Sequence, residues 1–264
     1  MQVRKMNRGS ELRELLRQRK KEGSKSLALL IDPEKMDQQA SFDDLIQRSS
    51  DFAIDFFFVG GSLVDPDKLA ACLRRIKRIA AGKVPTVLFP GSAMQVSEEA
   101  DAILFLSLIS GRNPELLIGQ HVLAAPSLSR SALEIIPTGY MLVNGGNSTS
   151  VEYISQTIPL PHDKPDLAVA TALAGKYLGL SVFYLDAGSG ASLPVPAEMI
   201  RAVGLHTGSP LFVGGGINSL EKARKAWQAG ADVLVIGNGA EKNPSLIAEV
   251  LQYAQWYNAS LNVN

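Results

Sequence analysis

Short, almost wholly apolar segments recur along the chain, and polar stretches separate them. They are too short for typical helices and lack a strict apolar–polar alternation, so they indicate strands that are buried on both faces. Seven of the predicted strands are residues 26–31, 56–59, 86–89, 102–107, 180–185, 211–213 and 233–236. An additional strand lies at 134–136, at 139–143, or across both with a break near Pro137. Eight strands alternating with helices are typical of a parallel sheet covered by helices.

Capping residues mark the starts of several intervening helices. Asp65 before Pro66 is one example, because aspartate accepts hydrogen bonds from the first free amides and proline fits the first helical position. The other predicted helix starts are at Ser10, at Ser41 with Asp44, at Asn113 before Pro114, at Asn218, and at Asn243 before Pro244. The helix that Ser10 would open precedes every strand, so we expect it to plug one end of the sheet.

Two stretches interrupt the alternation of strands and helices. Only about ten residues separate the third and fourth predicted strands, and a crossover helix usually needs more. The third helix is therefore predicted to be missing or replaced by an extended piece. Residues 144–166 form the longest irregular stretch and contain three prolines. A loop of this length in a compact domain is usually functional, so it is interpreted as a lid or, alternatively, as a solvated insertion.

The last three strands each run into a cluster of glycines, at residues 188–190, 214–216 and 237–239. Glycine loops expose backbone N–H groups that can face an anion, and eight-stranded barrels bind phosphate on the loops after their last strands. The predicted fold is therefore α/β, a modified (β/α)8 TIM barrel with its third helix missing or replaced. It would form one domain over residues 1–264, with an extra N-terminal helix at about residues 10–22. An open doubly wound sheet is the alternative, but no Gly-x-Gly-x-x-Gly follows the first strand.

Composition narrows the class of protein. The length of 264 residues suits one barrel domain, and 46% hydrophobic residues suffice for a large core. Lys+Arg 26 against Asp+Glu 26 gives no net charge, so a nucleic-acid partner is not expected. The single cysteine, Cys72, excludes a disulfide framework. The first residues are polar and no apolar run reaches the length of a membrane span, so we expect a cytoplasmic protein without stable membrane insertion.

Barrel enzymes carry their active sites at the C-terminal ends of the strands. The polar residues predicted there include Asp32, Ser62 and Asp186. Asp32 is a hard oxygen ligand that suits Mg2+ beside a substrate diphosphate, and Ser62 can supply a second oxygen. Each also has a structural interpretation: Asp32 as a helix cap, Ser62 as a turn serine.

Asp186 follows the sixth predicted strand and precedes a glycine cluster. A carboxylate beside an anion site can take a proton from a hydroxyl of a phosphorylated substrate; alternatively it caps the following turn. Tyr184 has the same parity in the strand, so both side chains are predicted to face the barrel interior. His121, His162 and His206 are scattered over different segments and indicate no metal cluster.

These motifs resemble the geranylgeranylglyceryl phosphate synthase family, which includes bacterial heptaprenylglyceryl phosphate synthases. The matching stretches are residues 31–33, 59–62, 107–114, 184–190, 213–217 and 237–238, in the family's order and spacing. The resemblance covers nearly the whole chain. It implies a barrel without its third helix, in agreement with the short connection between the third and fourth strands.

The resemblance further implies a Mg2+-dependent transfer of a polyprenyl group, geranylgeranyl in the first instance, from its diphosphate to sn-glycerol 1-phosphate. It implies Mg2+ at Asp32 and Ser62, a homo-oligomer such as a dimer or hexamer, and Asp186 as catalytic base. Glycerol 1-phosphate would be held by Tyr184, Leu185, Asp186, Ala187, Gly188, Ser189, Gly190, Gly215, Gly216, Gly237 and Asn238. The family usually has glutamate at the position of Asp186, so this base would be one methylene shorter.

Other functions use similar phosphate loops. A sugar-phosphate aldolase or isomerase would need a lysine or paired acids at the strand ends, and no lysine ends a predicted strand. An FMN-dependent barrel enzyme and a phosphate-binding scaffold without catalysis are further alternatives. Asp32 and Asp186 at two strand ends argue against the scaffold.

Overall fold

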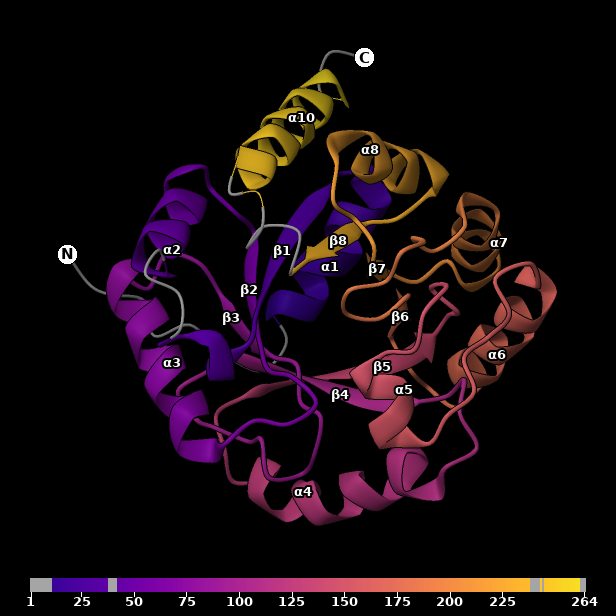
Figure 1. Cartoon of the computed structure of the whole chain (residues 1–264), viewed down its shortest axis with the longest axis horizontal. Coiled ribbons are helices and arrows are strands. Elements are labelled where there is room, and N and C mark those ends of the chain that lie inside the picture. Colours follow the sequence, from indigo (N-terminus) through magenta and orange to yellow (C-terminus); the bar gives the residue numbers. More distant parts are fainter. Residues whose placement is uncertain (1–10, 38–41, 238–242, 244, 262–264) are drawn as a thin grey trace.

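Parallel strands close into a barrel in which each strand is hydrogen-bonded to the next and β8 returns to β1 (Figure 1). The computed structural model describes residues 11–37, 42–237, 243 and 245–261. The strands are β1 (Ser26–Ile31), β2 (Phe56–Val59), β3 (Thr86–Leu88), β4 (Ala102–Leu108), β5 (Glu134–Leu142), β6 (Val182–Asp186), β7 (Leu211–Gly214) and β8 (Val233–Ile236). The closed barrel confirms the predicted fold class, and the open doubly wound alternative is wrong.

Helices cover the barrel: most form an outer ring around it, and the first lies across one end (Figure 1). They are α1 (Glu11–Glu22), the 3-10 turn η1 (Pro33–Lys35), α2 (Phe42–Asp51), α3 (Pro66–Ile79), the π-helical turn η2 (Glu115–Gly119), α4 (Gln120–Leu128), α5 (Ser150–Ser155), α6 (Pro165–Tyr177), α7 (Ala197–Thr207), α8 (Leu220–Ala229) and α10 (Ser245–Leu261). The Asp65 cap of α3 is confirmed, since its carboxylate accepts from the Asp67 and Lys68 amides. In the described ranges no helix has the length and apolar character to span a bilayer.

The connection from β3 to β4 contains no helix across residues 89–101, all of which are described. This confirms the predicted loss of the third helix. Buried Gln95 holds the connection in place. Its Oε1 accepts from the Gly91 amide at 2.8 Å, and its Nε2 donates to the Gly61 carbonyl at 3.1 Å. One amide side chain therefore ties the loops after β2 and β3 together.

Three sequence expectations need correction or completion. Ser219, and not Asn218, caps α8, because the Ser219 hydroxyl accepts from the Lys222 amide at 3.3 Å. The stretch 144–166 is not wholly irregular, since it contains α5 with a capping box between Thr149 and Glu152. β5 is one continuous strand through Pro137. The predicted caps at Ser10 and Ser41 lie outside the described residues.

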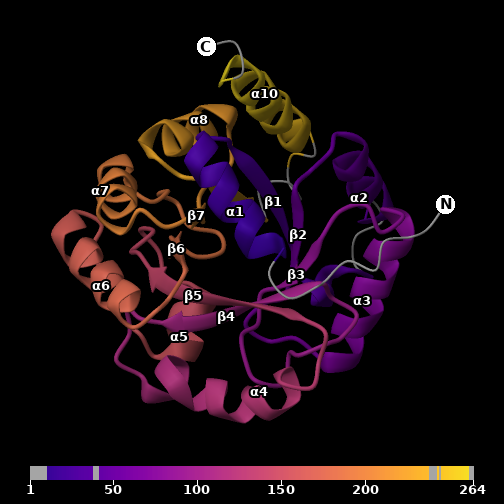
Figure 2. The same ribbon diagram turned by 180° about the vertical axis from the view of Figure 1, so that it is seen from behind.

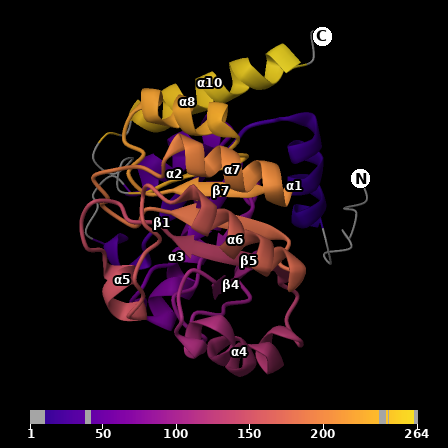
Figure 3. The same cartoon turned by 90° about the vertical axis from the view of Figure 1, so that its right-hand side faces the viewer.

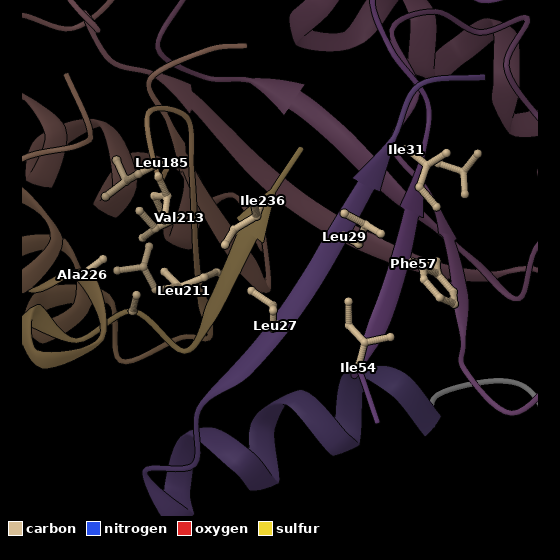
Figure 4. Close-up of a cluster of buried hydrophobic side chains, with 14 of the residues drawn as sticks. Leu27, Leu29, Ile31, Ile54, Phe57, Leu185, Leu211, Val213, Ala226 and Ile236 are labelled. Atoms are coloured by element: carbon tan, nitrogen blue, oxygen red, sulfur yellow. The ribbon is translucent and has the colours of Figure 1, made fainter. Parts of the chain in front are cut away.

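The core consists of two layers, one inside the barrel and one between the barrel and its helices. Alternating strand residues feed the two layers, because successive side chains of a strand point to opposite faces. In β6, Tyr184 lies in the inner layer and Leu185 in the outer one. Figure 4 shows side chains of the outer layer, including Leu27 and Leu29 of β1 and Val213 of β7. The strand pattern in the sequence is therefore apolar throughout.

Helix α1 lies across the N-terminal end of the barrel, at the opposite end from α5 (Figures 2 and 3). Leu16 is buried in the inner layer. The buried Glu134 carboxylate accepts from the Leu12 and Arg13 amides of α1, each at 2.8 Å. Lys20 pairs with Asp232 at 3.0 Å, and Arg19 pairs with Asp55. Helix α1 is thus fixed to three carboxylates around this end.

We expect Glu134→Ala to lower the free energy of unfolding by about 2 kcal/mol, because two helix N-terminal amides lose a charged acceptor. Urea denaturation of the variant and the wild type measures this difference. Glu14→Ala is the matched control, since Glu14 lies on the exposed side of the same helix; its effect should stay within about 0.5 kcal/mol. Equal stabilities of E134A and E14A would contradict the role given to Glu134.

Candidate active site

A cavity of about 650 Å3 opens at the C-terminal ends of the strands. It is the place where all the loops that follow the strands converge. The residues of its wall come from the C-terminal ends of all eight strands and from the described parts of the loops that follow them. Of the predicted site residues, the wall includes Asp32, Ser62, Tyr184, Asp186, Gly188, Ser189, Gly190, Gly215, Gly216 and Gly237. Asn238 lies outside the described residues.

The glycine clusters after β6 and β7 are packed against each other. Gly188, Gly190, Gly215 and Gly216 all have positive φ angles, between 68° and 87°, which glycine adopts at little cost. A Cβ atom at Gly215 would lie 2.7 Å from the backbone nitrogens of both Ala187 and Gly188. The two loops therefore approach as closely as they do only because no side chain stands between them. This forms a cradle of backbone groups that suits an anion.

Leu185 and Ala187, in β6 and the loop after it, point away from the cavity and toward the helices. Both are buried in the outer layer, between the barrel and the helices. The Ala187 amide donates to the Gly214 carbonyl at 3.1 Å and so joins the two glycine loops. Their side chains are therefore absent from the cavity wall, unlike those of Tyr184 and Asp186.

The Asp186 carboxylate is buried at the base of the cavity. The Tyr140 hydroxyl donates to Oδ2 at 2.8 Å, and the Gly188 amide donates to Oδ1 at 2.7 Å. Burial raises the pKa of Asp186 above its usual value, and the two hydrogen bonds oppose that rise. The turn-capping interpretation is thus realised by the Gly188 bond, and the same carboxylate also faces the cavity. A buried acid with a raised pKa is suited to accept a proton.

Tyr140 is a site residue that the sequence reasoning missed. It lies opposite Tyr184 in the β5–β6 register, so both rings face the barrel interior. The alternation of residues 139–143 could have placed Tyr140 on one face of its strand. It points to the site only once the pairing of Tyr140 with Tyr184 is known. Burial, with the Asp186 charge nearby, raises the pKa of both tyrosines well above the usual value, so they stay protonated.

An aromatic cluster forms the floor beside Asp186. The Tyr140 and Tyr184 ring centroids lie 5.4 Å apart in an edge-to-face arrangement. Phe89 lies 5.9 Å from Tyr140 and 5.5 Å from Tyr184. Edge-to-face packing of this kind stabilises a fixed ring geometry. The floor is therefore formed by three aromatic rings that pack against one another.

Asp32 and Ser62 lie at the rim where the loops after β1 and β2 meet. Asp32 Oδ1 accepts from the Glu34 amide at 3.1 Å and caps η1, so its predicted alternative role as a cap is also real. A Cβ atom at Gly61 would lie 3.6 Å from Asp32 Oδ1, which shows how closely the two loops approach. Within the described part of the chain no group of three or more His, Cys, Asp or Glu could hold a metal ion. A cation here would need ligands beyond the protein carboxylates.

Apolar side chains cover the wall on the side of the missing helix and of α5. They are Leu63, Phe89, Leu106, Leu116, Val151 and Ile154. The cavity therefore has one half at the glycine loops that is lined by backbone groups. The other half, at the β3–β4 side, is called the apolar half, although Asn113, Glu115 and Gln120 stand among its apolar residues. Such a division suits a ligand with an anionic end and a hydrocarbon chain.

A closed parallel barrel with a glycine cradle and a buried acid at the C-terminal ends of its strands is typical of enzymes that act on phosphate esters. Residues 18–254 match the PcrB family, and the chain belongs to that family.

Several known proteins are similar to this chain over most of its length. A protein of Spirosoma linguale named geranylgeranylglyceryl phosphate synthase is 52% identical over 247 residues, which cover 94% of this chain and 98% of that protein. A protein of Korarchaeum cryptofilum with the same name is 39% identical and covers 85% of this chain and 91% of its own length. The structure of (S)-3-O-geranylgeranylglyceryl phosphate synthase from Thermoplasma acidophilum in complex with its substrate sn-glycerol-1-phosphate superposes with a TM-score of 0.84 at 29% identity, over 91% of this chain and 97% of that one.

We expect Gly215→Ala to destabilise the fold by more than about 2 kcal/mol, because the new methyl group would meet two backbone nitrogens of the neighbouring loop. Gly208→Ala is the control. Gly208 also has a positive φ, 62°, but has no atom within 4 Å of an added Cβ, so it tests backbone strain alone, which costs about 1 kcal/mol. Urea denaturation compares the two, and equal losses would show that the loops do not depend on close approach.

Proposed function

We propose that this chain transfers a polyprenyl group, geranylgeranyl in the first instance, from its diphosphate to a hydroxyl of sn-glycerol 1-phosphate. In the reaction the hydroxyl oxygen bonds to the allylic carbon, and the bond from that carbon to the diphosphate oxygen breaks. The electron pair of the broken bond leaves with diphosphate. The product is a prenyl ether of glycerol phosphate, a precursor of a phospholipid. The names of the relatives and the ligand of the Thermoplasma acidophilum structure support this proposal.

The observation that carries the proposal is the position of Asp186 between the glycine cradle and the aromatic floor. Backbone amides of residues 189–190 and 215–216 would hold the phosphate. A hydroxyl of the bound glycerol would then reach the Asp186 carboxylate, whose orientation is fixed by Tyr140 and Gly188. Asp186 would accept the hydroxyl proton as the new ether bond forms. The side chains of Leu185 and Ala187 lie outside the cavity wall and would contribute backbone groups only.

Asp32 and Ser62 fit a bound Mg2+. Both present oxygen atoms to the cavity on neighbouring loops, and Mg2+ is usually held by one or two carboxylates together with substrate phosphates. The small number of protein ligands here agrees with that pattern. When bound, Mg2+ supplies positive charge that stabilises the departing diphosphate.

The apolar half of the cavity would hold the prenyl chain. Leu106 and Leu116 lie on the side where the third helix is missing, and Val151 and Ile154 belong to α5. Contacts of Asn147 with Ser192, at 2.8 Å between Oδ1 and Oγ, connect the 144–166 stretch to the loop after β6. This stretch would act as a lid that excludes water, which would otherwise react with the allylic cation.

A transfer assay with labelled prenyl diphosphates tests the reaction directly. Purified protein with Mg2+ and sn-glycerol 1-phosphate should give a butanol-extractable product, and the preferred chain length identifies the donor. Glycerol 3-phosphate and a chelator serve as the negative arms, and both should give no product. Product with glycerol 3-phosphate alone, or none at any chain length from folded protein, would overturn the proposal and return attention to the sugar-phosphate and flavin alternatives.

The pH dependence of transfer should report on Asp186. Activity falls when Asp186 is protonated, so the acidic limb of kcat/KM lies above the usual range of an aspartate because burial raises its pKa. The Tyr140 hydrogen bond lowers that pKa. Tyr140→Phe should therefore move the acidic limb to higher pH.

The control for this experiment is Tyr177→Phe, which changes an exposed tyrosine at the end of α6. Its pH profile should match that of the wild type. An acidic limb that stays in place in Y140F, or moves to lower pH, would show that Asp186 is not the base that limits the rate.

A further inference from the structure

Lys35 contributes a positive charge to a cavity wall that otherwise carries negative ones. The charged residues of the wall, among those described, are Asp32, Lys35, Glu115 and Asp186. Both substrates of the proposed reaction bring phosphate groups. The three carboxylates would repel these phosphate groups. The one ammonium would offset that repulsion for a phosphate group that binds beside it.

Among the described residues, the glycine cradle contributes no lysine to the cavity wall. Lys222, on the nearby α8, donates to the Gly216 carbonyl at 3.2 Å and does not belong to the wall. The groups that the cradle offers to an anion are therefore the backbone amides of its glycine loops. Lys35 belongs instead to the loop after β1, which carries Asp32 and packs against the loop after β2 with Ser62.

The backbone on both sides of Lys35 is anchored. Glu34 accepts from the Asp65 amide at 3.0 Å and pairs with Lys68. Met36 is buried in the outer core layer. The Lys35 amide itself donates to the Asp32 carbonyl at 3.1 Å. The base of the Lys35 side chain is thus held in a fixed position three residues from Asp32, and Lys35 lies in the wall of the same cavity.

We propose that the Lys35 ammonium binds the diphosphate of the prenyl donor and stabilises the negative charge that develops on it as the bond to the allylic carbon breaks. This assignment rests on the proposed function. The two anionic groups would then be recognised by different means: the glycerol phosphate by backbone amides, and the diphosphate by Lys35 together with the Asp32–Ser62 rim. An ammonium that can form charge-assisted hydrogen bonds is a common ligand for phosphate oxygens.

Calorimetric titration with inorganic pyrophosphate in the presence of Mg2+ tests the assignment without turnover. Lys35→Ala should weaken pyrophosphate binding by about tenfold or more, because a charge-assisted contact is lost. Lys35→Arg should retain most of the affinity. Binding of sn-glycerol 1-phosphate, titrated separately, should be the same in all three proteins. In the transfer assay, K35A should raise the KM for the prenyl diphosphate and leave the KM for glycerol 1-phosphate unchanged.

Lys83→Ala is the matched control, because Lys83 is an exposed lysine before β3, at the other end of the barrel. It removes the same charge and should bind pyrophosphate as the wild type does. Melting temperatures of the variants establish that each is folded. Unchanged pyrophosphate affinity in K35A, an equal loss in K83A, or a loss confined to glycerol 1-phosphate would each overturn the assignment.

The failure of this assignment is distinguishable from failure of the proposed function. A wild-type protein that forms no prenylated product refutes the prenyl transfer. If the K35A variant nevertheless binds pyrophosphate more weakly and the K83A variant does not, Lys35 is still established as a diphosphate ligand. A wild-type protein that transfers prenyl groups, with a K35A variant that binds pyrophosphate normally, refutes the role of Lys35 alone.

Discussion

The hydrogen-bonded ladder between β1 and β8 is the contact on which the rest of the structure depends. It pairs Ser26 with Val233 and Leu29 with Ile236, at positions more than two hundred residues apart in the chain. Because all strands run parallel, closing the sheet brings every C-terminal strand end to one rim. Asp32 after β1 and Gly237 after β8 thereby lie in a single cavity wall. Without closure the anion cradle and the acidic rim would lie at opposite edges of an open sheet.

Carboxylates occur at both ends of the barrel, but their surroundings differ. At the N-terminal end Glu134 accepts from two α1 amides, and Asp232 accepts from the Leu211 amide at 2.8 Å and pairs with Lys20. Asp101 likewise accepts from the Thr86 amide at 2.8 Å. These groups stabilise the charge of each carboxylate with donors of the chain itself. They join strands to each other and to α1, so this end contributes stability.

At the C-terminal end the acid faces the cavity. Asp186 is buried deeply enough that its pKa is raised in spite of two hydrogen bonds. Burial raises the pKa of Asp232 at the other end as well, but only Asp186 belongs to the cavity wall, where a substrate hydroxyl can reach it. The division agrees with the general separation of stability and catalysis between the two ends of such barrels. The connection that replaces the third helix begins at the same end, where Gln95 ties it to the loop after β2.

The sequence by itself determined the strands, the glycine clusters and the two strand-end aspartates. These features depend on local chemistry: apolar runs that must be buried, glycines at positive φ, and proline or aspartate at helix starts. The bounds of β1, β2 and β8 and the Asp65 cap could be predicted for that reason. The missing third helix could also be predicted, because a crossover helix usually needs more residues than this connection has.

Tertiary structure decided which of these residues share a site. Tyr140 meets Asp186 only through the β5–β6 register, and the sequence contains no local signal for a contact between residues 46 positions apart. Asn218 and Ser219 are both good caps, and the geometry of the turn selected Ser219. The sequence predicted that Tyr184 and Asp186 share the inner face of β6, and the closed barrel places Leu185 on the outer face. Local propensities fix elements, whereas closure and register, which are long-range, fix the site.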